Sequence, residues 1–367
     1  MTGRSLAILV TLCPVMALAQ APDPITLYGR VFVALESVEA AGDEGRATPL
    51  KRRTRVSDQS SLLGVRGSEA LGGALSAVFQ LETVFKADEN NSTFANRNSG
   101  IGLRGVPGTV VLGRWDTPLK AATTGVDAFS DLTLGGITAA LNGSGLAGRQ
   151  GTFDRRDTNV IQYWSPVVGG FALRLSHAVN EGRTGFLNPS QSGASLVYSA
   201  GTWYAGYAYD ELRDGTFAIE LEKQAAHAIF GHVTFGPLRV GLVHERILRP
   251  TFSTQKAWMA NAIASFGSHQ FIYQYQRARG GSDNRFEPIP AAGVPVPHVL
   301  FLVPGEPRCD VHVAAYQYHF SRRTMLLAQY VRISNNLPST CNFGTNPLPI
   351  DGGQDLRGAT LGMRHLF

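Results

Sequence analysis

Hydrophobic and polar residues alternate with a period of two in short segments along most of the chain. In Phe171–Val179, the odd positions hold mainly large apolar residues and the even positions hold Ala, Arg and Ser. The same pattern recurs in residues 75–82, 238–245 and 358–367. Because successive side chains of a strand point to opposite faces, each segment predicts a β-strand with one apolar face.

Two features of these strands favour a lipid-facing apolar surface over the alternative, a soluble β-sandwich or propeller. The polar faces are rich in Gly, Ala and Ser with single Arg or Glu residues, which is typical of a water-filled lumen. Large aromatic residues gather toward the segment ends, as the interfacial girdles of membrane proteins require. These residues are Tyr28, Phe85, Trp115, Tyr163, Trp164, Trp203, Phe235, Trp258, Phe266, Phe320 and Phe367.

The connections between the predicted strands alternate between tight turns and longer polar stretches. Seven are tight, such as 106–109 and 236–237, and eight are long, the longest being 117–157. With both termini on the short-turn side, this arrangement requires sixteen strands. In lipid every backbone N–H and C=O must be paired internally, and a closed barrel leaves no sheet edge. We therefore predict an all-β fold, a 16-stranded antiparallel transmembrane β-barrel.

The amino-terminal segment has the layout of an export signal. An apolar run, Leu6–Val15, follows one Arg and precedes small residues at positions 17 and 19. This pattern predicts a signal peptide over residues 1–19, removed from a single barrel domain of residues 20–367. A cut two residues later would leave Pro22 as the first residue, which is a poor cleavage product.

The composition agrees with this class of protein. Of the 367 residues 44% are hydrophobic, and the mean hydropathy is -0.03 because the apolar and polar faces average out. No segment after the signal reaches about 18 consecutive apolar residues, which excludes a helical membrane protein with several spans. The two remaining cysteines, Cys309 and Cys341, lie in Pro/Gly-rich stretches. Because an exported protein reaches an oxidising compartment, they could form a disulfide between two loops, and the sequence does not decide between this and two free thiols. No metal site and no cofactor are predicted.

Five stretches of the sequence resemble the sixteen-stranded general porins of Gram-negative outer membranes, of the neisserial and β-proteobacterial type. They are Ile25–Arg30, Leu62–Glu82, Gly102–Leu119, Tyr316–Thr324 and Leu361–Phe367. The resemblance implies a homotrimer in outer-membrane lipid, in which each barrel has its own pore. It also implies that the terminal Phe367 belongs to the signal read by the outer-membrane assembly machinery.

The same resemblance implies that the third extracellular loop, about residues 116–157, folds inward and narrows the pore. Its stretch Gly125–Asp131 is similar to the acidic and aromatic segment that lies against the pore wall in the family. Ala128 departs from the family, in which a Pro is common at this position.

Strand parity predicts which charged side chains point into the lumen. Four arginines share a face with small or polar residues and lie near the short-turn rim: Arg30, Arg66, Arg104 and Arg364. Glu82 lies on the polar face of its strand. On the loop, the acidic residues predicted to face these arginines are Asp116, Asp127 and Asp131. Arg114 points outward by parity unless Gly113 carries a bulge, and we include it because it matches the Gly-Arg pair of the family.

These charges predict an outer-membrane diffusion pore for small hydrophilic solutes and ions with a weak anion preference, since inward Arg residues favour anions. Each arginine could equally form a salt bridge that braces the loop. The alternative function is a substrate-specific channel for anionic metabolites or phosphate. A barrel enzyme would need a catalytic constellation at the rim, and the chain has no Gly-x-Ser-x-Gly elbow. Nothing in the sequence points to a nucleic-acid partner.

Overall fold

The computed structural model describes most of the chain beyond residue 24. The described ranges are 25–41, 50–89, 93–130, 132–142, 153–179, 183–184, 188–213, 223–249, 252–280, 306–337 and 339–367. The predicted signal peptide and Asp131 lie outside the described residues. In the described part, no helix is long and apolar enough to cross a membrane.

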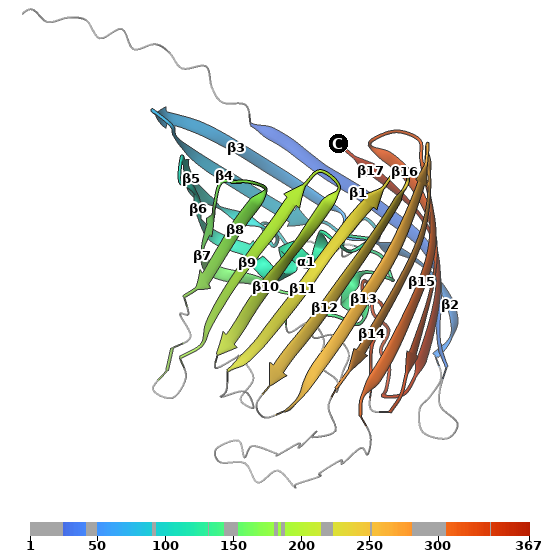
Figure 1. Ribbon diagram of the computed structural model, residues 1–367. Coiled ribbons are helices and arrows are strands. Elements are labelled where there is room, and N and C mark those ends of the chain that lie inside the picture. The colour runs from blue at the N-terminus through green and yellow to red at the C-terminus, as the bar shows by residue number, and fades with distance from the viewer. Residues whose placement is uncertain are drawn as a thin grey trace, which may run out of the picture.

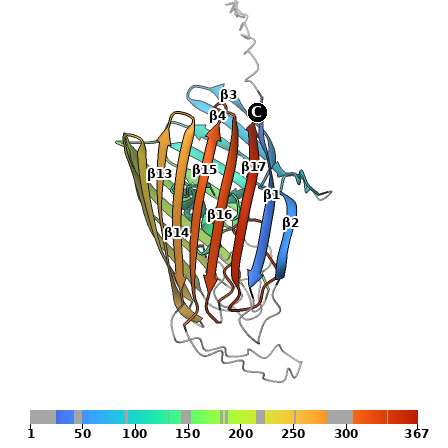
Figure 2. The same cartoon turned by 90° about the vertical axis from the view of Figure 1, so that its right-hand side faces the viewer.

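The strands form one antiparallel sheet that closes on itself (Figures 1 and 2). Their bounds are β1 Thr26–Ala41, β2 Leu50–Asp58, β3 Leu62–Gly72, β4 Leu75–Val84, β5 Ser99–Gly105, β6 Gly108–Asp116, β7 Arg156–Trp164, β8 Phe171–Ala178, β9 Ser190–Ala200, β10 Trp203–Arg213, β11 Gln224–Phe235, β12 Leu238–Arg249, β13 Phe252–Phe266, β14 His269–Arg279, β15 Arg308–His319, β16 Thr324–Asn335 and β17 Asp355–Leu366. Consecutive strands pair with each other, and β1 pairs with β17 to close the barrel.

The predicted count of sixteen strands is confirmed, although one strand position is interrupted. β2 pairs with the second half of β1, from Val33 to Ala40, and β3 pairs with the first half, from Thr26 to Arg30. Between β2 and β3, Ser60 adopts a φ of 62° and the backbone N–H of Ser61 donates to Oδ2 of Asp58. β2 and β3 therefore share one position in the wall.

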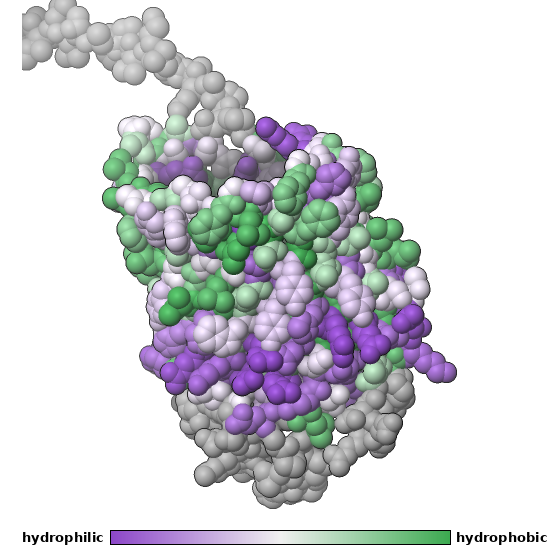
Figure 3. All heavy atoms as spheres, turned by 45° about the vertical axis from the view of Figure 1, so that its right-hand side comes forward, coloured by the Kyte–Doolittle hydropathy of each residue, from purple (hydrophilic) through white to green (hydrophobic). Residues whose placement is uncertain are grey.

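The two faces of the wall differ as strand parity predicts. On β14, Phe271 and Tyr273 are 54% and 49% exposed, whereas Gln274 on the other face is fully buried. On the face that Figure 3 shows, apolar side chains gather over the short-turn half of the barrel and polar ones nearer the long loops. Arg52 and Arg308, near the long-loop ends of β2 and β15, are exposed. The apolar side chains match the hydrocarbon layer of a bilayer, with the polar ones at its boundary.

Short turns occupy one rim, and Gly201, Gly236 and Gly267 take left-handed φ values of 54–58° in them. Exposed aromatic residues stand next to these turns, as expected for a girdle: Trp203, Phe235, Phe266 and Phe320. Trp115 and Trp164 do not belong to this girdle. Trp115 is buried and shares parity with buried Val111, and Trp164 shares parity with buried Gln162. The expectation for these two rings was wrong because it considered their place along the strand but not the face to which they point.

The segment after β6 lies against the inner face of the wall. The short helix α1, Pro118–Thr124, begins where the Thr117 hydroxyl accepts the N–H of Lys120, with Pro118 at the first helical position. α1 contacts β9 and β10 and lies within the ribbon barrel in Figure 1. A 3₁₀ turn, Ile137–Ala139, follows, and its apolar side chains pack with the wall and with Phe343.

A disulfide joins Cys309 at the start of β15 to Cys341 in the segment between β16 and β17, with Cα atoms 6.2 Å apart. Both residues are fully buried. The side chain of Asn335 donates to the Cys341 carbonyl and accepts the Cys341 N–H, at 2.9 and 3.0 Å. The segment after β16 is therefore held against the wall by one covalent and two hydrogen bonds.

Candidate pore and its charged lining

A cavity of about 490 Å³ lies between the wall and the segment that contains α1. The wall contributes Arg30, Ser60 and Arg97, and the opposite side contributes Lys120 of α1 and Ser130. Asp116, Asp154 and Arg156 also line it. Water-accessible space bounded by these charged groups is suited to the passage of hydrophilic solutes.

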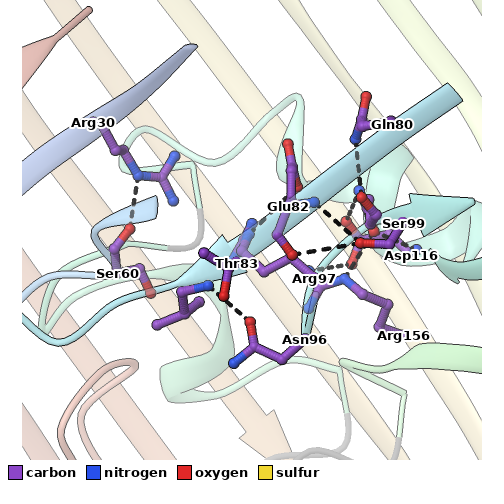
Figure 4. Close-up of polar contacts among 12 residues, drawn as sticks. Arg30, Ser60, Gln80, Glu82, Thr83, Asn96, Arg97, Ser99, Asp116 and Arg156 are labelled. Carbon is purple, nitrogen blue, oxygen red and sulfur yellow. Dashed lines mark hydrogen bonds and ion pairs between the residues drawn. The ribbon is translucent and has the colours of Figure 1, made fainter. Parts of the chain in front are cut away.

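The two acidic residues of this cavity are each paired with a base. Arg156 approaches Asp116 at 2.7 Å, and Lys120 approaches Asp154 at 2.6 Å. The side chain of Asn98 donates to Asp116 at 2.8 Å, and its carbonyl oxygen accepts from Arg156. Asp116 and Arg156 lie within one polar network in Figure 4.

Glu82 forms a second group of contacts near this cavity. Its carboxylate accepts the Tyr28 hydroxyl at 2.8 Å. It also lies 3.5 Å from Arg97, and Figure 4 shows both of these charged residues. The cavity itself is lined by four cationic and two acidic side chains, and Glu82 adds a third carboxylate through its contact with Arg97. The arrangement leaves an excess of positive charge on its walls.

Arg30 is the least neutralised of these cations. Its Nε donates to the carbonyl oxygen of Ser60 at 2.8 Å, as Figure 4 shows. Within the described residues it has no ion pair. The charges of Arg97 and Arg364 act on it, and the carboxylates of Glu82 and Asp58 oppose them more weakly. A guanidinium in this position keeps its charge at physiological pH and is weakly hydrated, so it attracts passing anions.

The other arginines predicted to point inward lie in two places. Arg66 and Arg104 line a second cavity nearer the short turns. Arg364 is half-buried beside the closure of the barrel, where its neighbour Phe32 belongs to β1. Its Nε atom has no hydrogen-bond partner in the described part of the chain. The four arginines lie on β17, β1, β3 and β5, on one side of the barrel with β4 between the last two, and they do not surround a single cavity.

The acidic residues predicted on the loop occupy different environments. Asp116 lines the first cavity and is paired there. Asp127 is 2% exposed, and its carboxylate accepts the N–H groups of Phe129 and Ile137 and the side-chain amide of Gln274. These contacts make Asp127 a group that holds the loop segment together and fastens it to β14.

Arg114 lies next to an irregularity in the wall. Gly113 pairs with Val160 and Trp115 pairs with Asp157, so β7 has one more residue than β6 across this interval. Arg114 itself stands opposite Ser99 and is half-buried, with its Nε unpartnered among the described residues. It does not line any of the cavities described here.

Sequence reasoning missed several charged residues that the fold brings to the pore. Arg97, Lys120 and Arg156 lie outside strands or at a strand end, where parity gives no direction. The sequence pattern did not indicate a role for Arg155 either. It approaches Asp157 at 2.7 Å and Asp210 at 2.6 Å, at the base of the loop. Burial by itself lowers the pKa of Arg155, but the attraction of Asp210 and Asp157 outweighs this effect, so the pKa is raised.

No cluster of three or more metal-ligating side chains occurs in the ranges that the structure describes. The features that remain are a closed barrel with an apolar exterior and charged, water-accessible cavities inside. This combination defines a membrane channel of the bacterial outer-membrane type.

The chain belongs to the Gram-negative porin family, whose sequence model matches residues 5–337. The protein is therefore located in the bacterial outer membrane. Family and fold are those of channels and not of enzymes.

Relatives and solved structures agree with this assignment. Outer membrane porin protein 32 of Delftia acidovorans is 34% identical over 95% of both chains. Major outer membrane protein P.IB of Neisseria gonorrhoeae is 28% identical, and the match spans 60% of this chain and 60% of the length of that relative. The anion-selective porin from Comamonas acidovorans shares the fold with a TM-score of 0.75 and 22% identity, over 94% of this chain and 100% of that chain. A trimer form of OmpT from Vibrio cholerae matches with a TM-score of 0.65 and 11% identity, over 95% and 100%.

Proposed function

We propose that this porin is a general diffusion channel for small hydrophilic solutes and ions, with a weak preference for anions. The observation that carries the proposal is the lining of the first cavity, where, among the described residues, the other three cations are each paired with a carboxylate and Arg30 forms no ion pair. Fixed charge in a narrow, low-dielectric passage concentrates counter-ions. The similar Comamonas porin is described as anion-selective, which supports the same direction here.

The test is the reversal potential of purified protein in planar bilayers under a KCl gradient. We expect a modest potential of the sign that chloride permeation gives, and Arg30→Gln should move it toward zero. Arg357→Gln is the matched control, because Arg357 is exposed on the outer face of β17 and lines no described cavity. A strong cation preference of the unaltered protein would refute the proposal.

A substrate-specific channel for anionic metabolites or phosphate is the second candidate, favoured by the same concentration of basic groups. Liposome swelling with a series of solutes separates the two. A diffusion channel admits neutral sugars and organic acids in order of size, whereas a specific channel admits one anion far faster than neutral solutes of its size.

We also propose that the porin assembles as a homotrimer, with the assembly machinery engaging its last strand. Phe367 exchanges backbone hydrogen bonds with Gly29 at 3.0 and 3.1 Å, so the last residue lies at the closure of the barrel. On an unheated detergent gel, the trimer should migrate above the monomer and convert to it on boiling. A sample that migrates as a monomer in both states, with the barrel intact, would contradict the trimer.

A further inference from the structure

The second cavity, of about 510 Å³, combines aromatic and cationic side chains on the inner face of the wall. Arg66, Arg104, Trp115 and Trp164 line it together with Gln80. Its volume is within the range of about 300–1,000 Å³ that small-molecule sites occupy. It lies toward the short turns, since Arg104 stands beside the turn that joins β5 to β6.

The two indole rings form the apolar part of this cavity. Trp115 and Trp164 meet edge to face with centroids 5.0 Å apart. The Trp164 Nε1 donates to the side chain of Gln162 at 2.9 Å, so its N–H is already satisfied by its own strand. Trp164 therefore offers a π surface rather than a hydrogen-bond donor to whatever enters.

The cationic part consists of Arg66 and Arg104, which line the cavity, and Arg174 of β8 beside it; two of the three are held against aromatic rings. Arg66 lies 5.0 Å from the centroid of Tyr28, and Arg174 of β8 lies 5.0 Å from that of Trp164. Within the described ranges, Arg66, Arg104 and Arg174 form no ion pair. Cation–π contact keeps Arg66 and Arg174 in place without neutralising them, and Arg104 is exposed to the cavity, so these groups remain able to bind an anion.

We propose that this cavity is a binding subsite for aromatic carboxylates on the route through the pore. The carboxylate would bind Arg66 and Arg104, and the ring of the ligand would pack against Trp164. A neutral sugar could stack on the same ring, but it would leave the guanidinium groups without a counter-charge. The proposal rests on the channel function proposed above and adds a class of preferred solute.

Solute block of the chloride current in planar bilayers tests the subsite. The probes are benzoate, cyclohexanecarboxylate, which has the same charge on a saturated ring, and the neutral benzyl alcohol. We expect benzoate to reduce the current at the lowest concentration, because only benzoate satisfies both the cationic and the aromatic part. Equal block by benzoate and cyclohexanecarboxylate in the unaltered protein would overturn the aromatic part of the proposal.

Two variants locate the block. Trp164→Leu should weaken benzoate block by about three- to tenfold, the usual size of an aromatic pair, and change cyclohexanecarboxylate block less. Arg104→Gln should weaken the block by both acids, and the exposed side chain of Arg104 makes this variant safe for folding. Trp203→Leu is the matched control, because Trp203 is 57% exposed on the outer girdle. Benzoate block that survives both Trp164→Leu and Arg104→Gln would refute the subsite.

The reversal potential under KCl, measured on the same membranes, separates this proposal from the channel function. Cation preference together with benzoate block refutes the anion-preferring channel and leaves the subsite in place. Anion preference without a difference between benzoate and cyclohexanecarboxylate refutes the subsite alone.

Discussion

Replacing Arg155 should destabilise the porin more than any single change in its cavity linings. Arg155 is 14% exposed and bridges Asp157 and Asp210, whose side chains are 2% and 1% exposed. In Arg155→Met, two buried carboxylates would lose their counter-charge and repel each other. Removal of one partner from a buried ion pair costs about 3–5 kcal/mol of unfolding free energy. We expect a loss of this size in urea-induced unfolding of the protein folded in lipid vesicles.

A double-mutant cycle isolates the cause of this loss. Asp210→Asn alone removes one acceptor and leaves Arg155 paired with Asp157. In the double variant Arg155→Met/Asp210→Asn, the neutral amide no longer needs the guanidinium and no longer repels Asp157, so part of the cost should be recovered, while buried Asp157 still lacks its counter-charge. Exposed Arg52, which pairs with Glu39 on the surface, supplies the control, because solvent screens such a pair and Arg52→Met should leave urea unfolding nearly unchanged. If Arg155→Met and Arg52→Met cost the same, or the double variant recovers nothing, burial of the carboxylates is not what makes Arg155 important.

The remaining predictions concern the disulfide, the pore charge and the end of the chain. Replacing both Cys309 and Cys341 by Ala should lower the unfolding free energy by about 3–4 kcal/mol, because the disulfide joins residues 32 apart and so reduces the entropy of the unfolded chain. Unchanged urea unfolding would contradict this prediction. Lys120→Gln should move the reversal potential toward cations, since it removes one of the four cations that line the first cavity; a shift toward anions would contradict it. Deletion of Phe367 should reduce the amount of trimer in outer membranes, measured on unheated gels, because its hydrogen bonds with Gly29 close the barrel; wild-type amounts would show that the last residue is dispensable.

Much of the wall could be predicted because the strand pattern is local. The alternation in Phe171–Val179 reports the two faces of β8 regardless of what the rest of the chain does. Parity likewise placed Arg30, Arg66 and Arg104 on the inner face, because each is directly next to a residue of the apolar face, such as Val31 beside Arg30 and Leu103 beside Arg104, and adjacent side chains point to opposite faces.

Strand parity did not predict the direction of side chains that lie outside regular strands, and position along a strand did not predict the face of an aromatic side chain. Arg97 and Lys120 lie in connections, so no alternation indicated that they line the first cavity. Position along the strand placed Trp164 in the girdle, whereas its side chain faces inward beside Arg174. Aromatic residues occur both at the lipid boundary on the outer face and in the cavity on the inner face. Composition alone does not distinguish these two locations.

The sequence by itself determined the class of fold, the number of strands, the lipid-facing side of each strand and the rim that carries the short turns. These properties follow from the period of the strand and from the demand of lipid that every backbone group be paired. Only the tertiary structure decided which charges are free and which are neutralised. Asp127 is fastened to Gln274, 147 residues further along, and Arg155 to Asp210, 55 residues further along. Such contacts depend on how the loop packs against the far wall, and no local pattern encodes that packing.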